Sequence, residues 1–247
     1  MRRLLPCLVL LLLGTSTADS ADLPPETAAR LAAALESLES SPAVAGYTMT
    51  VKATVAKPNG ADREDSVEVV KATRGLDGKL VHEVVKAIEN GKDITEKRRA
   101  ESEKRRAKEA EKDKGDEKKE ASVSASLKLP IGDDAALFAF SPTPSSGPYS
   151  LAFAPLPAHG KDDGLAHGAL AWDGATLDPL WLEAEPVVLP DHVSAMKLRF
   201  EFARTGALLY PRRTVTDGAG GLLWIKRTFH VEMEITDVVP ATPAPRP

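Results

Sequence analysis

Two histidines and two aspartates that could in principle bind a metal ion lie close together in the sequence. His159 and His167 flank Asp162 and Asp163, and imidazole and carboxylate groups are common ligands of Zn²⁺. The spacing of these four residues matches no common metal site, and loop histidines are usually solvated. We therefore expect no metal here.

Sequence motifs for catalysis are absent. The sequence contains no glycine-rich phosphate loop and no G-x-S-x-G nucleophile elbow. Its single cysteine, Cys7, lies in an N-terminal segment that we expect to be removed, so the mature chain would lack a thiol for catalysis, metal binding or a disulfide. We expect a protein that is not an enzyme and has no cofactor. A hydrolase with an unrecognised site is the weakest alternative.

The N-terminus has the pattern of a secretory signal peptide. Arg2 and Arg3 precede an apolar run, residues 4–13, that is too short to span a bilayer. Small residues at Ser16 and Ala18 are compatible with cleavage after Ala18 or Ser20. We predict that residues 1–20 are a signal peptide and that the protein is exported.

Length and charge limit the remaining possibilities. The 247-residue chain carries a formal net charge of −4, which argues against nucleic acid as a partner. The chain is long enough for a substantial core, and we predict a single domain over residues 21–239. The proline-rich tail, residues 240–247, is expected to be disordered.

The elements that would position any site are mostly strands, and the clearest lie near the C-terminus. Apolar and polar side chains alternate from Met196 to Ala203 and again from Leu223 to Ile235, which predicts strands with one apolar face. A further strand is expected between them, over Ala207–Val215. We interpret Asp217–Gly221 as a loop whose glycines adopt positive φ. Three neighbouring antiparallel strands follow from this pattern.

The rest of the chain predicts one helix and several further strands. Asp22, as an acidic N-cap, and the prolines after it begin a helix that stops before Ser40. Period-two alternation or short apolar runs between turn signals then predict the other strands. These strands cover residues 46–55, 66–73, 79–88, 123–129, 137–140, 149–153, 168–172 and 180–185.

Residues 92–120 form a charged insertion with almost no apolar side chains. Oppositely charged residues three or four positions apart favour a solvated helix. One interpretation is a docking arm for an anionic membrane surface, and the other is an inert solvated insertion. Interspersed carboxylates favour the inert insertion. The candidate docking residues are Lys97, Arg98, Arg99, Lys104, Arg105 and Arg106.

The apolar face of the predicted sheet also has two interpretations. It is either a core sealed by the first helix or an open surface that holds an acyl chain. A large sheet with one amphipathic helix has more apolar surface than that helix can cover, which favours the cavity. Trp224, Lys226 and Arg227 would lie at its mouth as a cation–π or phosphate-binding group, or simply on an exposed strand. The candidate cavity residues are Met196, Leu198, Phe200, Phe202, Leu223, Ile225, Phe229, Val231 and Met233.

Several segments resemble those of a known family. The order of signal peptide, one helix, a tyrosine-led first strand and a long meander is similar to the periplasmic outer-membrane lipoprotein carrier and sorting (LolA-like) superfamily. The similarity is carried by Phe153–Pro155, Gly168–Asp173, Leu189–Val193 and Gly221–Arg227. The resemblance implies an incomplete β-barrel, covered by helices on one side, whose hydrophobic concavity holds lipid or lipoprotein acyl groups.

Together these observations predict a mainly β protein of the α+β class, an antiparallel half-barrel covered by an N-terminal helix and carrying a charged helical insertion. We expect a monomeric periplasmic carrier of lipid or lipoprotein acyl chains that also contacts envelope membrane proteins. The alternative is an envelope structural or stress-sensing protein that binds a protein partner through the same sheet.

Overall fold

A computed structural model describes residues 22–35, 43–75, 77–112, 127–143, 149–222 and 225–241 of the chain. The predicted signal peptide and residues 242–247 of the predicted disordered tail lie outside these ranges. Pro240, the first residue of that predicted tail, ends the last strand.

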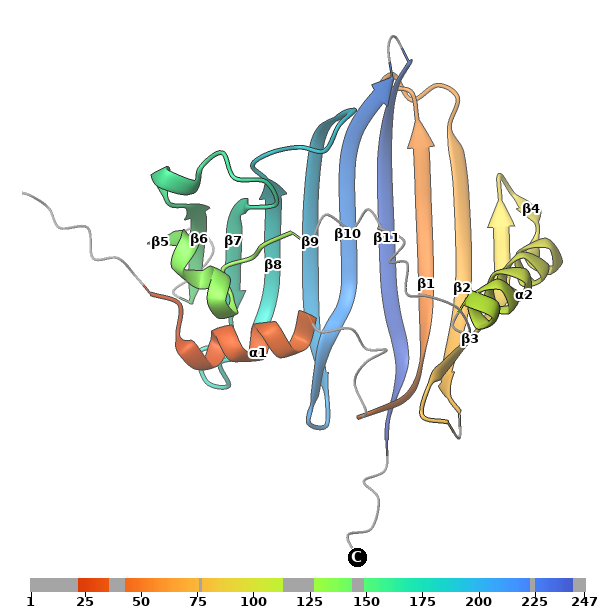
Figure 1. The fold of residues 1–247 in the computed structure, drawn as a ribbon, viewed down its shortest axis with the longest axis horizontal. Coiled ribbons are helices and arrows are strands. Elements are labelled where there is room, and N and C mark those ends of the chain that lie inside the picture. The colour runs from red at the N-terminus through yellow and green to blue at the C-terminus, as the bar shows by residue number, and fades with distance from the viewer. Residues whose placement is uncertain are drawn as a thin grey trace, which may run out of the picture.

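The described chain forms one open antiparallel sheet of eleven strands with a few helices (Figure 1). The strand order is β4-β3-β2-β1-β11-β10-β9-β8-β7-β6-β5, so β4 and β5 are the two edges and the sheet does not close. This confirms the predicted mainly β, α+β class. The strands are β1 (Val44–Ala56), β2 (Glu64–Arg74), β3 (Leu80–Glu89), β4 (Lys92–Asp93), β5 (Phe138–Pro142), β6 (Ser150–Pro155), β7 (Ala166–Trp172), β8 (Pro179–Pro186), β9 (Val193–Thr205), β10 (Leu208–Leu222) and β11 (Ile225–Pro240).

The predicted C-terminal meander is confirmed, because β9, β10 and β11 pair in succession. The loop predicted over Asp217–Gly221 is wrong, since β10 runs through it to Leu222. Two of its glycines permit close approach and do not turn the chain. A Cβ on Gly218 would lie 2.1 Å from the Phe229 ring, and one on Gly220 would lie 2.4 Å from the His192 carbonyl oxygen.

Cross-strand register gives the sheet two chemically different faces. Leu198 pairs with Thr216, Thr216 with Val231, and Val231 with Ala53, so these side chains share one face. We call it the apolar face. The opposite face, here called the polar face, carries Arg199 and the charged residues that alternate with the apolar ones.

Helix α1 (Pro25–Leu35) lies on the apolar face and contacts β8 and β10 (Figure 1). It confirms the predicted N-terminal helix, with Pro25 in the first turn where a missing N–H is harmless. Leu31 and Ala34 are buried against the sheet. The predicted end of this helix before Ser40 lies outside the described residues.

The chain from Leu127 to Leu137 covers the same face further along the sheet. The strand predicted over residues 123–129 is wrong for its described part, where Lys128 makes only an isolated bridge to Leu165. A 3-10 helix, η1 (Gly132–Leu137), follows before β5. Leu129 is buried in the main core, so its apolar character reflects packing and does not indicate a strand.

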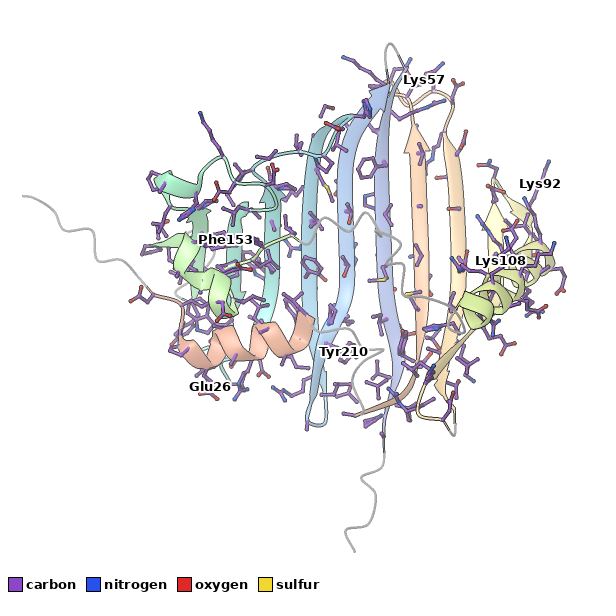
Figure 2. All side chains as sticks on the ribbon, viewed as in Figure 1. Glu26, Lys57, Lys92, Lys108, Phe153 and Tyr210 are labelled. Carbon is purple, nitrogen blue, oxygen red and sulfur yellow. The ribbon has the colours of Figure 1, made fainter. Side chains whose placement is uncertain are left out.

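The largest core cluster lies between these segments and strands β5 to β8. Leu31 from α1 packs with Leu170 and Leu182, and each of the three is 0% exposed. Figure 2 shows Phe153 among the side chains gathered in this region. A smaller cluster around Tyr47, Tyr210 and Ile235 stabilises the sheet near the ends of β1 and β11.

The charged insertion begins with β4, which pairs with Ile88 and Glu89, and continues as helix α2 (Thr95–Lys112). The predicted helix is confirmed over these residues. It lies against β3, and Lys108 projects from it in Figure 2. None of the helices in the described ranges is long and apolar enough to cross a membrane.

Candidate functional site

The predicted cavity residues converge on the apolar face. Met196, Leu198, Phe200 and Phe202 come from β9, where they alternate with charged neighbours. The others come from β11 and share the same face through the register of β10. They are Phe229, Val231 and Met233. Leu223 lies outside the described residues, as does the side chain of Ile225.

Within this set, Phe200 and Phe202 lie beside the sealed core. Both are partly buried and pack against the cluster that contains Leu31 and Leu182. Their position next to α1 makes them a boundary between the covered and uncovered parts of the face. A direct contact between either ring and a ligand stays a prediction.

Met196 and Leu198 instead line a pocket of about 620 Å³. The pocket forms where β8 and β9 separate, because their pairing ends at Ala184 and Leu198. The two strands are joined by a loop of six residues, 187–192, in which Val188 and Leu189 form part of the pocket wall. We call this site the apolar pocket.

The wall of the apolar pocket is held by backbone hydrogen bonds at both ends. Val187 N–H donates to the Leu165 carbonyl at 2.8 Å, and Gly221 N–H donates to the His192 carbonyl at 2.8 Å. Pro186 and Pro190, which both line the pocket, restrict the backbone between these anchors. The wall is therefore largely preformed.

A second cavity of about 450 Å³ adjoins the apolar pocket and shares Pro186, Leu189 and Met196 with it. It reaches Gly218 on β10, where the Phe229 ring occupies the position that a side chain would take. The second cavity therefore lies at the same end of the sheet as the loop 187–192, along residues 194–197 of β9 and 217–219 of β10.

Thr214, Val231 and Met233 occupy the middle of the apolar face and are only partly buried. Thr214 lies between Phe200 and Met233 in register, and its Oγ1 is buried with no hydrogen-bond partner among the described residues. A hydroxyl left without a partner usually costs free energy. Thr214 Oγ1 is therefore a buried polar atom without a partner among the described groups of this stretch, as Thr27 Oγ1 is on α1.

The polar face is stabilised by an ion-pair ladder across β8, β9, β10 and β11. Arg199 donates to Glu183 at 2.6 Å and to Glu201 at 3.2 Å, and its guanidinium lies 5.5 Å from the Trp181 ring centroid. Burial alone would raise the pKa of Glu183, but hydrogen bonds from Lys197 and Arg199 outweigh it and lower that pKa. The charged residues of the polar face therefore stabilise the sheet by pairing with one another.

One ionic cluster attaches α1 to the sheet. Asp178, directly before β8, accepts hydrogen bonds from Arg30 of α1 and from Arg204 of β9. The Arg204 hydrogen bond is the main reason that the pKa of Asp178 lies below its usual value. The carboxylate is only 13% exposed, so its two arginines hold the helix over the core.

Arg227 lies at the far end of the apolar face, in register with Gly220 and two residues before Phe229 on β11. Its Nη1 is 4.0 Å from Asp62, which is itself 2.5 Å from Lys57. Nη1 is buried and has no hydrogen-bond partner among the described residues. Trp224 is outside those residues, and the phosphate-binding role suggested for this group stays a prediction.

The predicted docking residues divide into two sets. Arg98 and Arg99 contact the protein itself, at Glu68 and at the Val84 carbonyl. The other four are exposed on α2. They are Lys97, Lys104, Arg105 and Arg106.

The histidine loop offers no metal centre in the described chain. His159 pairs with Asp162 at 2.9 Å, whereas His167 lies 3.8 Å from Glu185 on another strand. No group of three or more histidines, cysteines and carboxylates among the described residues is placed to hold a metal ion.

No protein-family model matches the sequence, and no curated protein matches it.

The pocket wall was not among the predicted site residues. Val187, Val188 and Leu189 form an apolar run between two prolines, where a surface link would normally be polar. This run is the signal in the sequence that points to a buried or ligand-facing loop.

Proposed function

We propose that the protein binds the hydrocarbon chain of an amphiphile on its apolar face, with the apolar pocket as the main point of contact. The observation that carries the proposal is the separation of β8 from β9, which opens an apolar pocket beside Met196 and Leu198.

The size and chemistry of the pocket support this function. Small-molecule sites are usually concave, largely apolar and roughly 300–1,000 Å³ in volume. The pocket, at about 620 Å³, lies within that range, and most of its lining side chains are apolar. Each methylene moved out of water contributes about 0.8 kcal/mol, so even a short chain would bind measurably.

The resemblance to the LolA-like superfamily suggests a cellular role for this binding. As in the LolA-like superfamily, the sheet would act as a half-barrel that carries lipid or lipoprotein acyl chains in the periplasm. The open edges of the sheet and the helix across one face are compatible with such a carrier. The exposed cations of α2, including Lys104 and Arg105, would then approach an anionic membrane.

The direct test is titration of detergent-free protein with the uncharged dye N-phenyl-1-naphthylamine. Met196→Asp places a charge on the pocket floor and should weaken dye binding at least tenfold. Val81→Asp is the matched control, because Val81 is 48% exposed on β3 and lies outside the pocket. It should bind as the unchanged protein does, and circular dichroism should show that both variants are folded.

Absence of dye binding to the unchanged protein would contradict the proposal. Equal binding by folded Met196→Asp would place the ligand elsewhere and contradict the role of the apolar pocket. The first result would favour a sheet that contacts a protein partner.

A further inference from the structure

We propose that the apolar pocket selects amphiphiles whose head group is positively charged. This inference rests on the proposed function and adds the class of ligand. It comes from the charged members of the pocket lining, Asp163 and Asp191, which are both carboxylates.

The two carboxylates belong to separate loops that meet at the pocket. Asp163 lies in the loop before β7, next to Gly164, which also lines the pocket. Asp191 lies in the loop between β8 and β9, beside Pro190. Both are exposed, whereas Met196 and Leu198 beneath them are partly buried. The site therefore combines an apolar floor with an acidic rim.

Neither rim carboxylate is neutralised within the described residues. No hydrogen bond or ion pair joins the side chain of Asp163 or Asp191 to another described group. Nearby acids differ in this respect: Asp162 pairs with His159 at 2.9 Å, and Glu183 pairs with Lys197 at 2.9 Å. The negative charge at the rim is thus free to attract a ligand.

No lysine or arginine among the described residues lines the apolar pocket. Lys197 lines the adjoining cavity, but its ammonium is already paired with Glu183. An anionic head group at the rim would meet two carboxylates and, among the described lining residues, no lysine or arginine. An ammonium group would meet two acceptors, while its chain lies against Leu198 and Met196.

The expected preference is moderate because the rim is exposed to solvent. Ion pairs at exposed positions are weak and are screened by salt, so two of them should change affinity by roughly tenfold. Binding of the hydrocarbon chain itself should remain in the absence of the charges, since it depends on the pocket floor.

The test compares dodecylammonium, dodecanoate and uncharged dodecyl maltoside, each below its micelle concentration, as competitors of the neutral dye. The titrations are made in low-salt buffer at pH 7, which limits screening of the charges. Dodecylammonium should bind about tenfold more tightly than dodecanoate. The preference should shrink to within about twofold in Asp163→Asn/Asp191→Asn and at 0.5 M salt.

A matched control removes the same charge from a different place. Asp133→Asn/Asp134→Asn alters two acids of η1 that do not line the pocket, and the preference should persist in this variant. The control separates a local effect of the rim from the overall negative charge of the protein.

The outcomes distinguish this inference from the proposed function. If all three amphiphiles bind equally, or dodecanoate binds best, the acidic rim does not select the ligand although the pocket binds chains. Loss of the preference in the η1 control would also overturn the inference. If no amphiphile displaces dye, or no dye binds, the proposed function itself fails.

Discussion

The two halves of the apolar face differ in how completely they are covered. Over β6, β7 and β8, α1 and the segment through η1 bury Leu170 and Leu182 completely. Over β10, β11 and β1, comparable apolar residues such as Val231 and Met233 remain partly exposed. The core under α1 is therefore more completely covered than the middle of the face over β10, β11 and β1, although Tyr47, Tyr210 and Ile235 form a buried cluster near the strand ends.

The helices explain this difference. Helix α1 contributes Leu31 and Ala34 to the core, so it can cover apolar side chains. Helix α2 contacts the other end of the sheet mainly through polar groups. Arg99 Nε–H donates to the Val84 carbonyl at 2.7 Å, and Ala87 N–H donates to Thr95 Oγ1 at 2.9 Å. It therefore satisfies backbone groups of β3 that β4 does not pair with.

The largest expected effect contrasts one leucine of the sealed half with one methionine of the open half. Leu182→Ala should lower the free energy of unfolding by about 3 kcal/mol, because a fully buried side chain leaves a cavity. Met233→Ala, at a partly exposed position, should cost about half as much. Urea unfolding followed by circular dichroism measures both. Equal losses would mean that the two halves are equally packed.

The next effect concerns the close approach of β10 and β11. Gly218→Ala should destabilise the protein by about 2 kcal/mol, because the added methyl group meets the Phe229 ring. Gly160→Ala is the control, since the nearest atom to its added Cβ is 3.8 Å away. The double variant Gly218→Ala/Phe229→Leu should recover part of the loss. Failure to recover would show that the ring is not the source of the clash.

A smaller effect is expected where α1 is attached to the sheet. Asp178→Asn should cost about 1–2 kcal/mol, because two arginines lose a charged acceptor. The pKa of Asp178 is lowered mainly by its Arg204 hydrogen bond. The stabilisation should therefore be present above the unfolded pKa of about 3.9 and be lost as pH falls below it.

The pH dependence of stability provides a second test of this prediction. In Asp178→Asn, the loss of stability between pH 6 and pH 3, measured by urea unfolding, should be smaller than in the unchanged protein. Glu26→Gln removes the more exposed partner of Arg30 and should have little effect. An identical pH profile for Asp178→Asn would contradict the assigned role of the carboxylate.

The smallest effect tests the hydrogen bond that attaches α2 to the backbone of β3. Arg99→Gln should lower the unfolding free energy by about 1 kcal/mol, because the hydrogen bond to the Val84 carbonyl is lost. Arg106→Gln, at an exposed position of the same helix, should leave stability unchanged. Thermal or urea unfolding distinguishes the two variants, and equal stability would mean that water replaces the guanidinium.

The sheet and the first helix could be predicted because their residues alternate or repeat with the right period. The end of β10 could not, since glycines that permit close packing have the same composition as a flexible loop. Distinguishing them requires knowledge of what lies opposite, here the Phe229 ring and the His192 carbonyl.

The candidate site could be predicted only in part. Alternation placed Met196 and Leu198 on an apolar face, but it does not show that β8 and β9 separate above Leu198. The separation depends on the loop 187–192 and its backbone contacts to Leu165 and Gly221. Only a tertiary structure brings these segments together, and the same is true of the two rim carboxylates.

Hydrogen–deuterium exchange with and without dodecylammonium tests the central claim most directly. The amphiphile should slow exchange in the backbone around the apolar pocket, over residues 186–198, where the chain would lie against Met196 and Leu198. Exchange in the sealed strands β6 and β7 should not change. Protection confined to the sealed strands, or no protection in the pocket at saturating ligand, would contradict an amphiphile site at the apolar pocket.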